Sequence, residues 1–207
     1  MSKYSFYYFG INGRATIPRA ILSYAKADWE NHMVKFEEWP TLKKSGLCEF
    51  EQLPVLEVDG KKYCESYAIM LYLAEKFDLL GKNVEENYEI NNILFATEDY
   101  LSAIFKIWHS QDESKKKEFA KQAEEKLIFF IKKFEAKIVK NKKGKYYLGE
   151  KLTLADIVLG TALTDAVDLL KMEKDTCEKF APNLGKYIKD LRENELKEFF
   201  EKYYIKF

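Results

Sequence analysis

The stretch QLPVLEVDGKKYCES, residues 52–66, decides the fold because it predicts two strands joined by a tight turn. Residues 55–58 are rich in the β-branched and large aliphatic side chains that favour strands. Asp59-Gly60 is the strongest short signal for a two-residue hairpin turn. Residues 61–64 then supply the return strand, so we expect an antiparallel hairpin at the centre of the fold.

Two features of this stretch also suit ligand binding. Pro54 has no N–H to donate, so it belongs at the first position or the edge of a strand. A cis Leu53-Pro54 bond would turn the backbone N–H and C=O of Leu53 outward, toward an extended peptide ligand. Ser66 stands where a helix N-cap is expected, and a helix N-terminus attracts carboxylates. On these residues alone, an ordinary hairpin followed by a capped helix remains the favoured interpretation.

Composition excludes several classes of function. The chain has 207 residues, enough for one or two domains, and 34 basic residues balance 34 acidic ones. We find neither a basic stripe nor a groove-reading motif, so we expect no nucleic-acid partner. The longest apolar runs are far too short to cross a membrane, and the N-terminal residues do not have the pattern of a signal peptide. We therefore expect no membrane partner.

Cysteine and histidine usage argues against a metal site. The three cysteines, Cys48, Cys64 and Cys177, are far apart and lack metal-type spacing, which suits a reduced cytoplasm. Only two histidines, His32 and His109, are present, so we expect neither a zinc site nor a histidine-based triad.

The N-terminal part of the chain alternates between strand and helix patterns. Strands are expected over residues 4–9, 29–36, 55–58 and 61–64, and helices over residues 15–27 and 66–77, the latter closed by Gly81. Residues 38–51 are expected to be irregular. This order predicts a mixed four-stranded sheet in the thioredoxin-like arrangement. Tyr8 falls near the end of the first strand, where functional residues of α/β folds gather.

The remaining residues carry only helical patterns. Helices are expected over residues 86–108, 114–139, 153–170 and 184–200. Thr153 and Asp156 are spaced as a capping box. The fold class is therefore α/β plus all-α: residues 1–80 form a thioredoxin-like domain, and residues 84–207 form an all-helical domain.

The chain resembles the cytosolic glutathione transferases, most closely their sigma class, over essentially its whole length. The motifs that carry this resemblance are specific in combination. They are Tyr8-Phe9 with Gly13-Arg14-Ala15, Trp39-Pro40 with Lys43, residues 52–60, and Glu65-Ser66.

The resemblance implies where glutathione binds. It would lie extended along residues 52–54, with its cysteinyl backbone paired to Leu53. Its γ-glutamyl carboxylate would meet Ser66, beside Glu65. Its glycyl carboxylate is implied to meet a further set of side chains, namely Trp39, Lys43 and Gln52. The resemblance also implies a homodimer, in which Asp99 contacts the γ-glutamyl end of the partner subunit's glutathione, and a second domain that supplies the electrophile pocket.

Tyr8 is the candidate activator of the glutathione thiol. A thiol with a pKa near 8.5 is only about 3% thiolate at pH 7, and the thiolate is the nucleophile. A phenol that donates a hydrogen bond to sulfur favours the charged form, and the guanidinium of Arg14 supports it. Tyr7 is the alternative, but strand alternation sends Tyr7 and Tyr8 to opposite faces. The Tyr-Phe pattern of the family selects Tyr8.

The sequence departs from the family pattern at three places beside these residues. Thr16 replaces the usual Glu, Gly10-Ile11-Asn12-Gly13 replaces Asn-x-Arg-Gly, and Glu65 replaces the Gln of the sigma class. We expect these changes to alter the affinity for glutathione rather than the chemistry.

The leading hypothesis is a cytoplasmic detoxification enzyme that conjugates glutathione to small hydrophobic electrophiles. One alternative is a glutathione-dependent isomerase of the prostaglandin D synthase type, and another is a non-enzymatic relative resembling a lens crystallin or a ligand-binding protein. No motif separates conjugation from isomerisation. The second-substrate pocket is expected to draw on some of Ile104, Phe105, Trp108, Tyr203, Tyr204 and Phe207.

Overall fold

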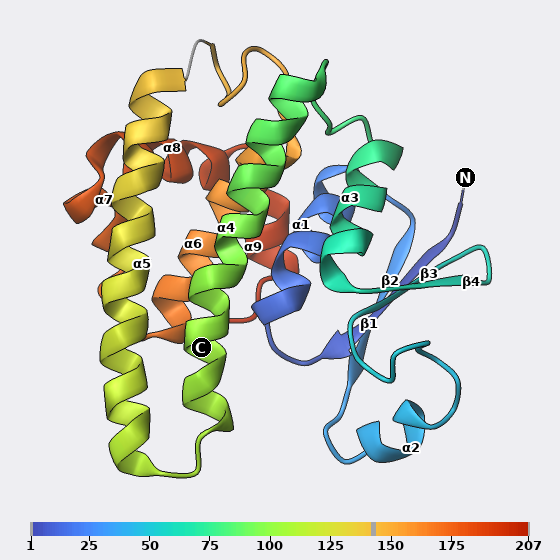
Figure 1. Ribbon diagram of the computed structural model, residues 1–207. Coiled ribbons are helices and arrows are strands. Elements are labelled where there is room, and N and C mark those ends of the chain that lie inside the picture. Colours follow the sequence, from blue (N-terminus) through green and yellow to red (C-terminus); the bar gives the residue numbers. More distant parts are fainter. Residues whose placement is uncertain (1, 142–143, 207) are drawn as a thin grey trace. The chain divides into compact units, whose positions relative to one another are not determined.

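The computed structural model describes residues 2–141 and 144–206 (Figure 1). The chain divides into two compact units. The first unit comprises the residues up to Asp78 together with Glu195–Lys206, and the second comprises Leu79–Asn194. Each unit has its own set of helices, and the described strands all belong to the first.

A four-stranded sheet forms the centre of the first unit. The elements of this unit are β1 (Tyr4–Phe9), a 3-10 turn η1 (Gly13–Ala15), α1 (Thr16–Tyr24), β2 (Trp29–Val34), α2 (Trp39–Lys43), β3 (Val55–Val58), β4 (Lys61–Cys64), α3 (Ser66–Lys76) and α9 (Lys197–Lys202). The strand order is β2-β1-β3-β4. β2 runs parallel to β1, whereas the other neighbours are antiparallel. The predicted mixed sheet and thioredoxin-like arrangement are confirmed.

Alternating residues of β1 bury one face of this sheet against α1 and α3. Tyr4, Phe6 and Tyr8 are all buried and share a face because side chains alternate along a strand. The Tyr4 ring lies 5.7 Å from the ring of Phe77 at the end of α3, and the Phe6 ring lies 5.9 Å from the guanidinium of Arg19 on α1. Figure 1 shows α1 and α3 together on this side of the sheet.

The central hairpin forms as its turn chemistry predicts. Asp59 and Gly60 have φ of +49° and +84°, the left-handed pair that a two-residue hairpin turn requires. Before β3, the Leu53-Pro54 bond is cis. Pro54 therefore precedes the first paired residue of the strand, Val55, as its missing N–H leads one to expect.

The end of α3 differs from the expectation. The helix ends at Lys76, and Asp78, with φ of +57°, turns the chain out of it. Gly81 does not close the helix, because its backbone N–H donates instead to the side-chain oxygen of Asn87 at 2.9 Å. An aspartate adopts the left-handed region more readily than most residues, so it replaces the expected glycine.

The C-terminal segment packs on the first unit, although the sequence analysis placed residues 84–207 together. Asn12 is almost fully buried, and its amide makes two hydrogen bonds to the backbone of Ile205, at 2.7 and 3.0 Å. The ring of Tyr203 lies 4.7 Å from that of Trp29. These contacts join positions near opposite ends of the chain, which no local pattern encodes.

The second unit is a helical bundle. Its helices are α4 (Val84–His109), α5 (Glu113–Asn141), α6 (Leu154–Leu169), α7 (Thr176–Phe180) and α8 (Pro182–Glu193). Figure 1 shows α4 and α5 as a long antiparallel pair. α6 is buried on nearly all sides, and α4 and α8 pack against it. Among the described residues, no helix combines the length and apolar character needed to span a membrane.

The predicted capping box begins α6. The carboxylate of Asp156 accepts hydrogen bonds from the backbone N–H of Thr153 at 2.6 Å and from its hydroxyl at 2.9 Å. It also accepts from the backbone N–H of Tyr147 at 2.8 Å and from the hydroxyl of Tyr187 at 2.5 Å. Asp156 therefore joins the start of α6 to the preceding loop and to α8.

Candidate active site

One end of the sheet gathers the residues that the sequence singled out. Tyr7 pairs with Val55 across β1 and β3, and Val55 pairs with Cys64 across β3 and β4. Continuing both registers by one residue places Tyr8, Pro54 and Glu65 in one row across the sheet. β1 is about to end in this row, β3 has not yet begun and β4 has just ended. Pro54 and Glu65 therefore lie just outside the paired strands, whereas Tyr8 stays paired with Met33 of β2.

The start of α3 corrects one expectation. Glu65, and not Ser66, is the N-cap, and Ser66 is the first residue of the helix. The chain passes from β4 into α3 within one residue, so Glu65 takes the turn, with φ of +70° and ψ of 113°. The Glu65 side chain makes no capping hydrogen bond within the described part of the chain. Glu65 therefore does not cap α3 with its side chain, and a helix N-terminus favours a negatively charged group.

Tyr8 lies on the face of the sheet that α1 and α3 cover. Its side chain is 6% exposed, and its ring lies 5.9 Å from the guanidinium of Arg19. Arg14, the other candidate catalytic residue, is half-buried on η1. Gly13 precedes it with φ of +59°, a conformation that favours glycine.

Tyr7 faces the opposite side of the sheet. Its ring stacks on that of His32 at 4.4 Å and packs against the apolar cluster that contains Leu47 and Val55. Burial and the nearby Glu57 carboxylate raise the pKa of Tyr7, so its phenol is held neutral. The two adjacent tyrosines therefore have separate environments, as strand alternation predicts.

Arg19 is a residue of this region that the sequence analysis missed. It is fully buried, and its guanidinium donates to the backbone carbonyls of Ile11 at 2.6 Å and Phe9 at 3.1 Å. A third hydrogen bond reaches the side-chain oxygen of Asn31 at 3.1 Å. Arg19 thus fixes the loop that follows Tyr8. The sequence did contain a signal for this role, because Arg19 is the one charged residue in a short helix that is otherwise largely apolar.

α2 carries two candidate binding residues. Trp39 is half-buried, and its ring meets that of Phe9, the last residue of β1, edge to face at 5.8 Å. Lys43 lies 3.8 Å from the carboxylate of Glu51 in a pair that is largely exposed. Such a pair contributes little stability, so the Lys43 ammonium can turn to another carboxylate.

Gln52 and Leu53 complete the set in the first unit. Gln52 is exposed, and its backbone N–H donates to the Sγ of Cys48 at 3.4 Å. Leu53 is half-buried against the cluster of Leu47, Cys48 and Val55. Residues 52–53, which lead into β3, are therefore held in place by this apolar cluster and by the hydrogen bond to the Cys48 thiol.

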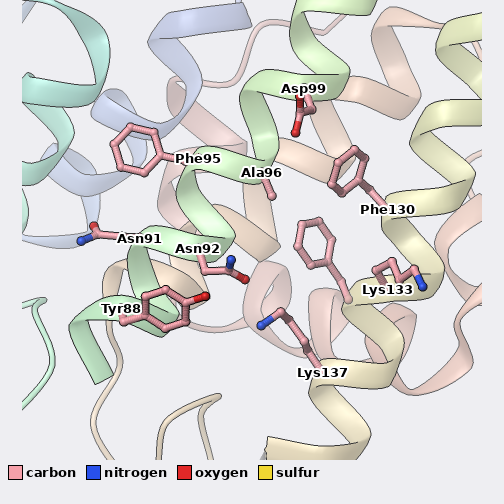
Figure 2. A pocket seen from close by; sticks show the side chains of 10 residues that line it. Tyr88, Asn91, Asn92, Phe95, Ala96, Asp99, Phe130, Lys133 and Lys137 are labelled. Atoms are coloured by element: carbon pink, nitrogen blue, oxygen red, sulfur yellow. The ribbon is translucent and has the colours of Figure 1, made fainter. Parts of the chain in front are cut away.

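Asp99 lies in the second unit, on α4. It is exposed and is 3.8 Å from the ammonium of Lys126 on α5. Asp99 also lines a groove of about 530 Å³ between α4 and α5 (Figure 2). The residues that line this groove are Tyr88, Asn91, Asn92, Phe95, Ala96, Asp99, Phe130, Lys133, Phe134 and Lys137.

The residues considered for the second-substrate pocket have diverse environments. Ile104 is fully buried in the core of the second unit, whereas Trp108 is 44% exposed. Tyr203 packs on Trp29 in the first unit. Phe207 lies outside the described residues.

Comparisons with known proteins agree with this fold. The family model described as glutathione S-transferase, N-terminal domain, matches residues 4–75, and the one described as glutathione S-transferase, C-terminal domain, matches residues 98–203. Glutathione S-transferase 2 of Manduca sexta is 38% identical over 159 residues, which cover 76% of each chain.

Two solved structures are similar over nearly the whole chain. Prostaglandin synthase D of Nilaparvata lugens is 30% identical with a TM-score of 0.82, and the match covers 98% of this chain and 99% of that one. A monomeric glutathione S-transferase of Necator americanus is 27% identical with a TM-score of 0.82, and the match covers 99% of this chain and 100% of that one.

A thioredoxin-like sheet, followed along the chain by a helical unit, defines a two-domain transferase architecture. The chain belongs to the glutathione S-transferase family, whose members are enzymes that use glutathione as co-substrate.

Proposed function

We propose that Tyr8 donates a hydrogen bond to the sulfur of bound glutathione and that Arg14 adds positive charge beside it. Both effects stabilise the thiolate over the thiol and so lower the pKa of the thiol. A lowering of about two pKa units is worth roughly 2.7 kcal/mol and raises the thiolate fraction at pH 7 by roughly twentyfold or more. The resulting nucleophile attacks an electrophilic carbon and forms the thioether conjugate.

The observation that carries this proposal is the paired row of Tyr7, Val55 and Cys64, because Tyr8, Pro54 and Glu65 are the next residues along the three strands. An extended tripeptide laid across this row can pair its backbone with Leu53. Its sulfur would then meet the Tyr8 end of the row, and its γ-glutamyl end would meet Glu65 and the start of α3. The catalytic phenol and the backbone contacts thus belong to one surface.

The two ends of glutathione differ in charge, and the site offers matching groups. At the γ-glutamyl end, the first turn of α3 at Ser66 attracts the carboxylate, and Glu65 takes the ammonium. At the glycyl end, Lys43 takes the carboxylate, and Trp39 and Gln52 act as hydrogen-bond donors. Lys43 exchanges its weak pair with Glu51 for this contact.

The second substrate is a small hydrophobic electrophile, and the helical unit contributes residues to its pocket. We place the enzyme in the sigma class, in the cytoplasm and in detoxification. The similarity to a protein named prostaglandin synthase D supports a second candidate, an isomerase that uses the same thiolate. Assays with a chloronitrobenzene electrophile and with a prostaglandin endoperoxide on one preparation distinguish conjugation from isomerisation.

We also propose a homodimer in which the α4–α5 groove faces a second copy of the chain. Tyr88 and Phe95 on α4 are 64% and 49% exposed, a large apolar area for a surface in contact only with water. Figure 2 shows Tyr88 and Asp99 directed toward α5 and Phe95 directed away from it. In the dimer, Asp99 would reach the γ-glutamyl end of the partner subunit's glutathione.

The decisive experiment compares Tyr8→Phe with Tyr7→Phe. We expect Tyr8→Phe to bind glutathione nearly as well as the parent enzyme but to turn over roughly ten- to a hundredfold more slowly, because one hydrogen bond to a charged group is lost. The pKa in its pH–rate profile should rise toward that of free glutathione. A larger loss of turnover in Tyr7→Phe would overturn the assignment.

A further inference from the structure

Two of the three cysteines, Cys48 and Cys64, are in contact next to the segment that is a candidate for binding glutathione. The Sγ atoms of Cys48 and Cys64 are 3.1 Å apart, and both residues are reduced thiols. Cys48 is 5% exposed within the cluster of Leu47 and Val55. Cys64 is the half-buried last residue of β4 and is paired in register with Val55. In the sequence the two cysteines are well separated and show no motif.

The backbone around the two sulfurs is arranged to hold them in place. The N–H of Gln52 donates to the Sγ of Cys48 at 3.4 Å, and the backbone of Glu49 makes a hydrogen bond to the thiol of Cys64. A disulfide bond is about 2.05 Å long, so bond formation requires the sulfur atoms to approach by only about 1 Å. The remaining cysteine, Cys177, is buried in the second unit.

We propose that Cys48 and Cys64 form a reversible intramolecular disulfide, and that glutathione disulfide is the oxidant. Glutathione is the co-substrate of the family, so its oxidised form accompanies it wherever the enzyme works. The pair would thus report the ratio of oxidised to reduced glutathione in its surroundings.

The exchange proceeds in two steps, and Cys64 reacts first because it is the more exposed of the two. Its thiolate attacks one sulfur of glutathione disulfide, which forms a mixed disulfide and releases one glutathione thiolate. The thiolate of Cys48 then attacks the Cys64 sulfur and releases the second glutathione. The two thiol protons pass through solvent to the released thiolates. Overall, two electrons move from the protein dithiol to glutathione disulfide, which yields one protein disulfide and two molecules of reduced glutathione.

The surroundings of the pair make this exchange slow at neutral pH. Burial, together with the hydrogen bond to Cys48 and the nearby Glu49 carboxylate, raises the pKa of Cys64, so little of it is thiolate. At pH values below that pKa, the thiolate fraction increases about tenfold for each unit by which the pH rises, and the rate of oxidation should increase with it.

Oxidation has a consequence for ligand binding that rests on the proposed function. The Cys48 sulfur accepts the N–H of Gln52, which immediately precedes Leu53, the residue proposed to pair with glutathione. When Cys48 moves toward Cys64, this hydrogen bond is weakened or broken and the binding segment shifts. The loss of about one hydrogen bond corresponds to glutathione affinity roughly two- to tenfold weaker in the oxidised enzyme.

The test equilibrates the full-length enzyme with mixtures of reduced and oxidised glutathione, alkylates the remaining thiols and measures the mass of the denatured chain. As the oxidised share rises, we expect the number of alkylated cysteines to fall from three to one, with no glutathione retained. Peptide mapping should find Cys48 linked to Cys64. Cys177→Ser is the matched control and should form the same disulfide.

Cys48→Ser provides an independent readout because it removes only the second step. This variant should accumulate one glutathione on Cys64 as a trapped mixed disulfide. If peptide maps of the oxidised parent enzyme show only glutathione adducts, only linkages through Cys177, or three unmodified thiols, the proposal is overturned. This result does not depend on whether any variant folds.

Glutathione titration of the oxidised and reduced enzyme then tests the consequence for binding separately. Weaker binding after oxidation supports the link through Gln52. If the disulfide forms and the affinity is unchanged, the link is refuted, whereas the disulfide itself stands independently of the proposed site.

Discussion

Adjacent residues of β1 illustrate how strongly environment differs from one position to the next. Tyr7 and Tyr8 have the same chemistry, but Tyr7 stacks on His32 whereas Tyr8 lies above the guanidinium of Arg19. A positive charge near a phenol stabilises a neighbouring anion, whereas the Glu57 carboxylate near the half-buried Tyr7 disfavours one. At the residue scale, position on the strand therefore gives the two tyrosines different electrostatic surroundings.

Glu65 combines an unusual backbone with a charged side chain. Its φ of +70° is uncommon for a residue other than glycine, and such conformations cluster at functional sites. The start of α3 takes the glutathione carboxylate in our proposal, so Glu65 is left to meet the ammonium. The alternative is a solvated surface carboxylate beside a helix cap.

We expect Glu65→Gln to weaken glutathione binding by up to about tenfold, because one neutral hydrogen bond replaces a charge-assisted one. Calorimetric titration with glutathione measures the change. Glu75→Gln, at an exposed position of α3, is the matched control and should bind as the parent enzyme does. Tighter binding by Glu65→Gln would mean that Glu65 opposes the carboxylate and that the pairing is reversed.

Arg19 is expected to position Tyr8 through the loop that it holds. A lysine keeps the charge but cannot direct three hydrogen bonds in the geometry of a guanidinium. Arg19→Lys should therefore lose about 2–4 kcal/mol of unfolding free energy and lower kcat more than it raises KM for glutathione. Chemical denaturation and steady-state kinetics measure the two effects.

The pH–rate profile separates positioning from general destabilisation in Arg19→Lys. A shift of the apparent thiol pKa toward that of free glutathione is expected, because a displaced Tyr8 no longer stabilises the thiolate. Arg192→Lys changes an exposed arginine of the second unit and should leave the profile unaltered. A normal profile in Arg19→Lys would assign Arg19 to stability alone.

At the scale of elements, a well-organised polar contact centred on Glu89 joins α4 to α5. The carboxylate of Glu89 on α4 accepts from the ammonium of Lys137 on α5 at 2.8 Å and from the hydroxyl of Tyr147 at 3.0 Å. Burial tends to raise the pKa of Glu89, but the hydrogen bonds from Lys137 and Tyr147 outweigh it and leave the pKa below its ordinary value of 4.5. Ionised Glu89 therefore stabilises the helix pair.

We expect Glu89→Gln to lose about 1 kcal/mol of unfolding free energy at pH 7. Because the pKa is lower in the folded state, this stabilisation is complete above the ordinary pKa and disappears as the pH falls through the folded-state value. The difference between parent and variant should thus vanish under strongly acidic conditions. Urea denaturation across pH measures it, and Glu125→Gln, which changes an exposed pair with Lys121, should show little difference at any pH.

At the scale of the whole molecule, the candidate glutathione contacts are divided unevenly between the two units. The first unit holds every candidate glutathione contact except Asp99, which lies on α4 in the second unit. A contact from Asp99 to glutathione of a partner subunit would make each site depend on assembly. The similarity to a transferase named as monomeric makes the oligomeric state a property to be measured for this chain.

We expect specific activity per chain to fall when the enzyme is diluted below the dissociation constant of the dimer. Sedimentation and activity measured over the same dilution series test this. Asp99→Ala should raise KM for glutathione more than it lowers kcat. Asp190→Ala changes an exposed aspartate on α8 and serves as the control. A monomer as active per chain as the concentrated enzyme would refute the shared site.

The sequence by itself determined the local parts of this protein. The hairpin turn at Asp59-Gly60, the strand over residues 4–9 and the capping box at Thr153 all formed as expected. Each depends on residues only a few positions apart, whose backbone preferences and hydrogen bonds do not need the rest of the fold. The motifs around Tyr8 and over residues 52–60 were likewise sufficient to indicate the family from the sequence.

Only the tertiary structure decided the features that join distant residues. Three such features depend on which elements pack together. They are the burial of Arg19 against β1, the hydrogen bonds between Asn12 and Ile205, and the contact between Cys48 and Cys64. Ser66 is the first residue of α3 and not the expected N-cap, because Glu65 makes the turn between β4 and the helix. Side-chain packing and strand register act over long sequence separations, and a single sequence shows neither.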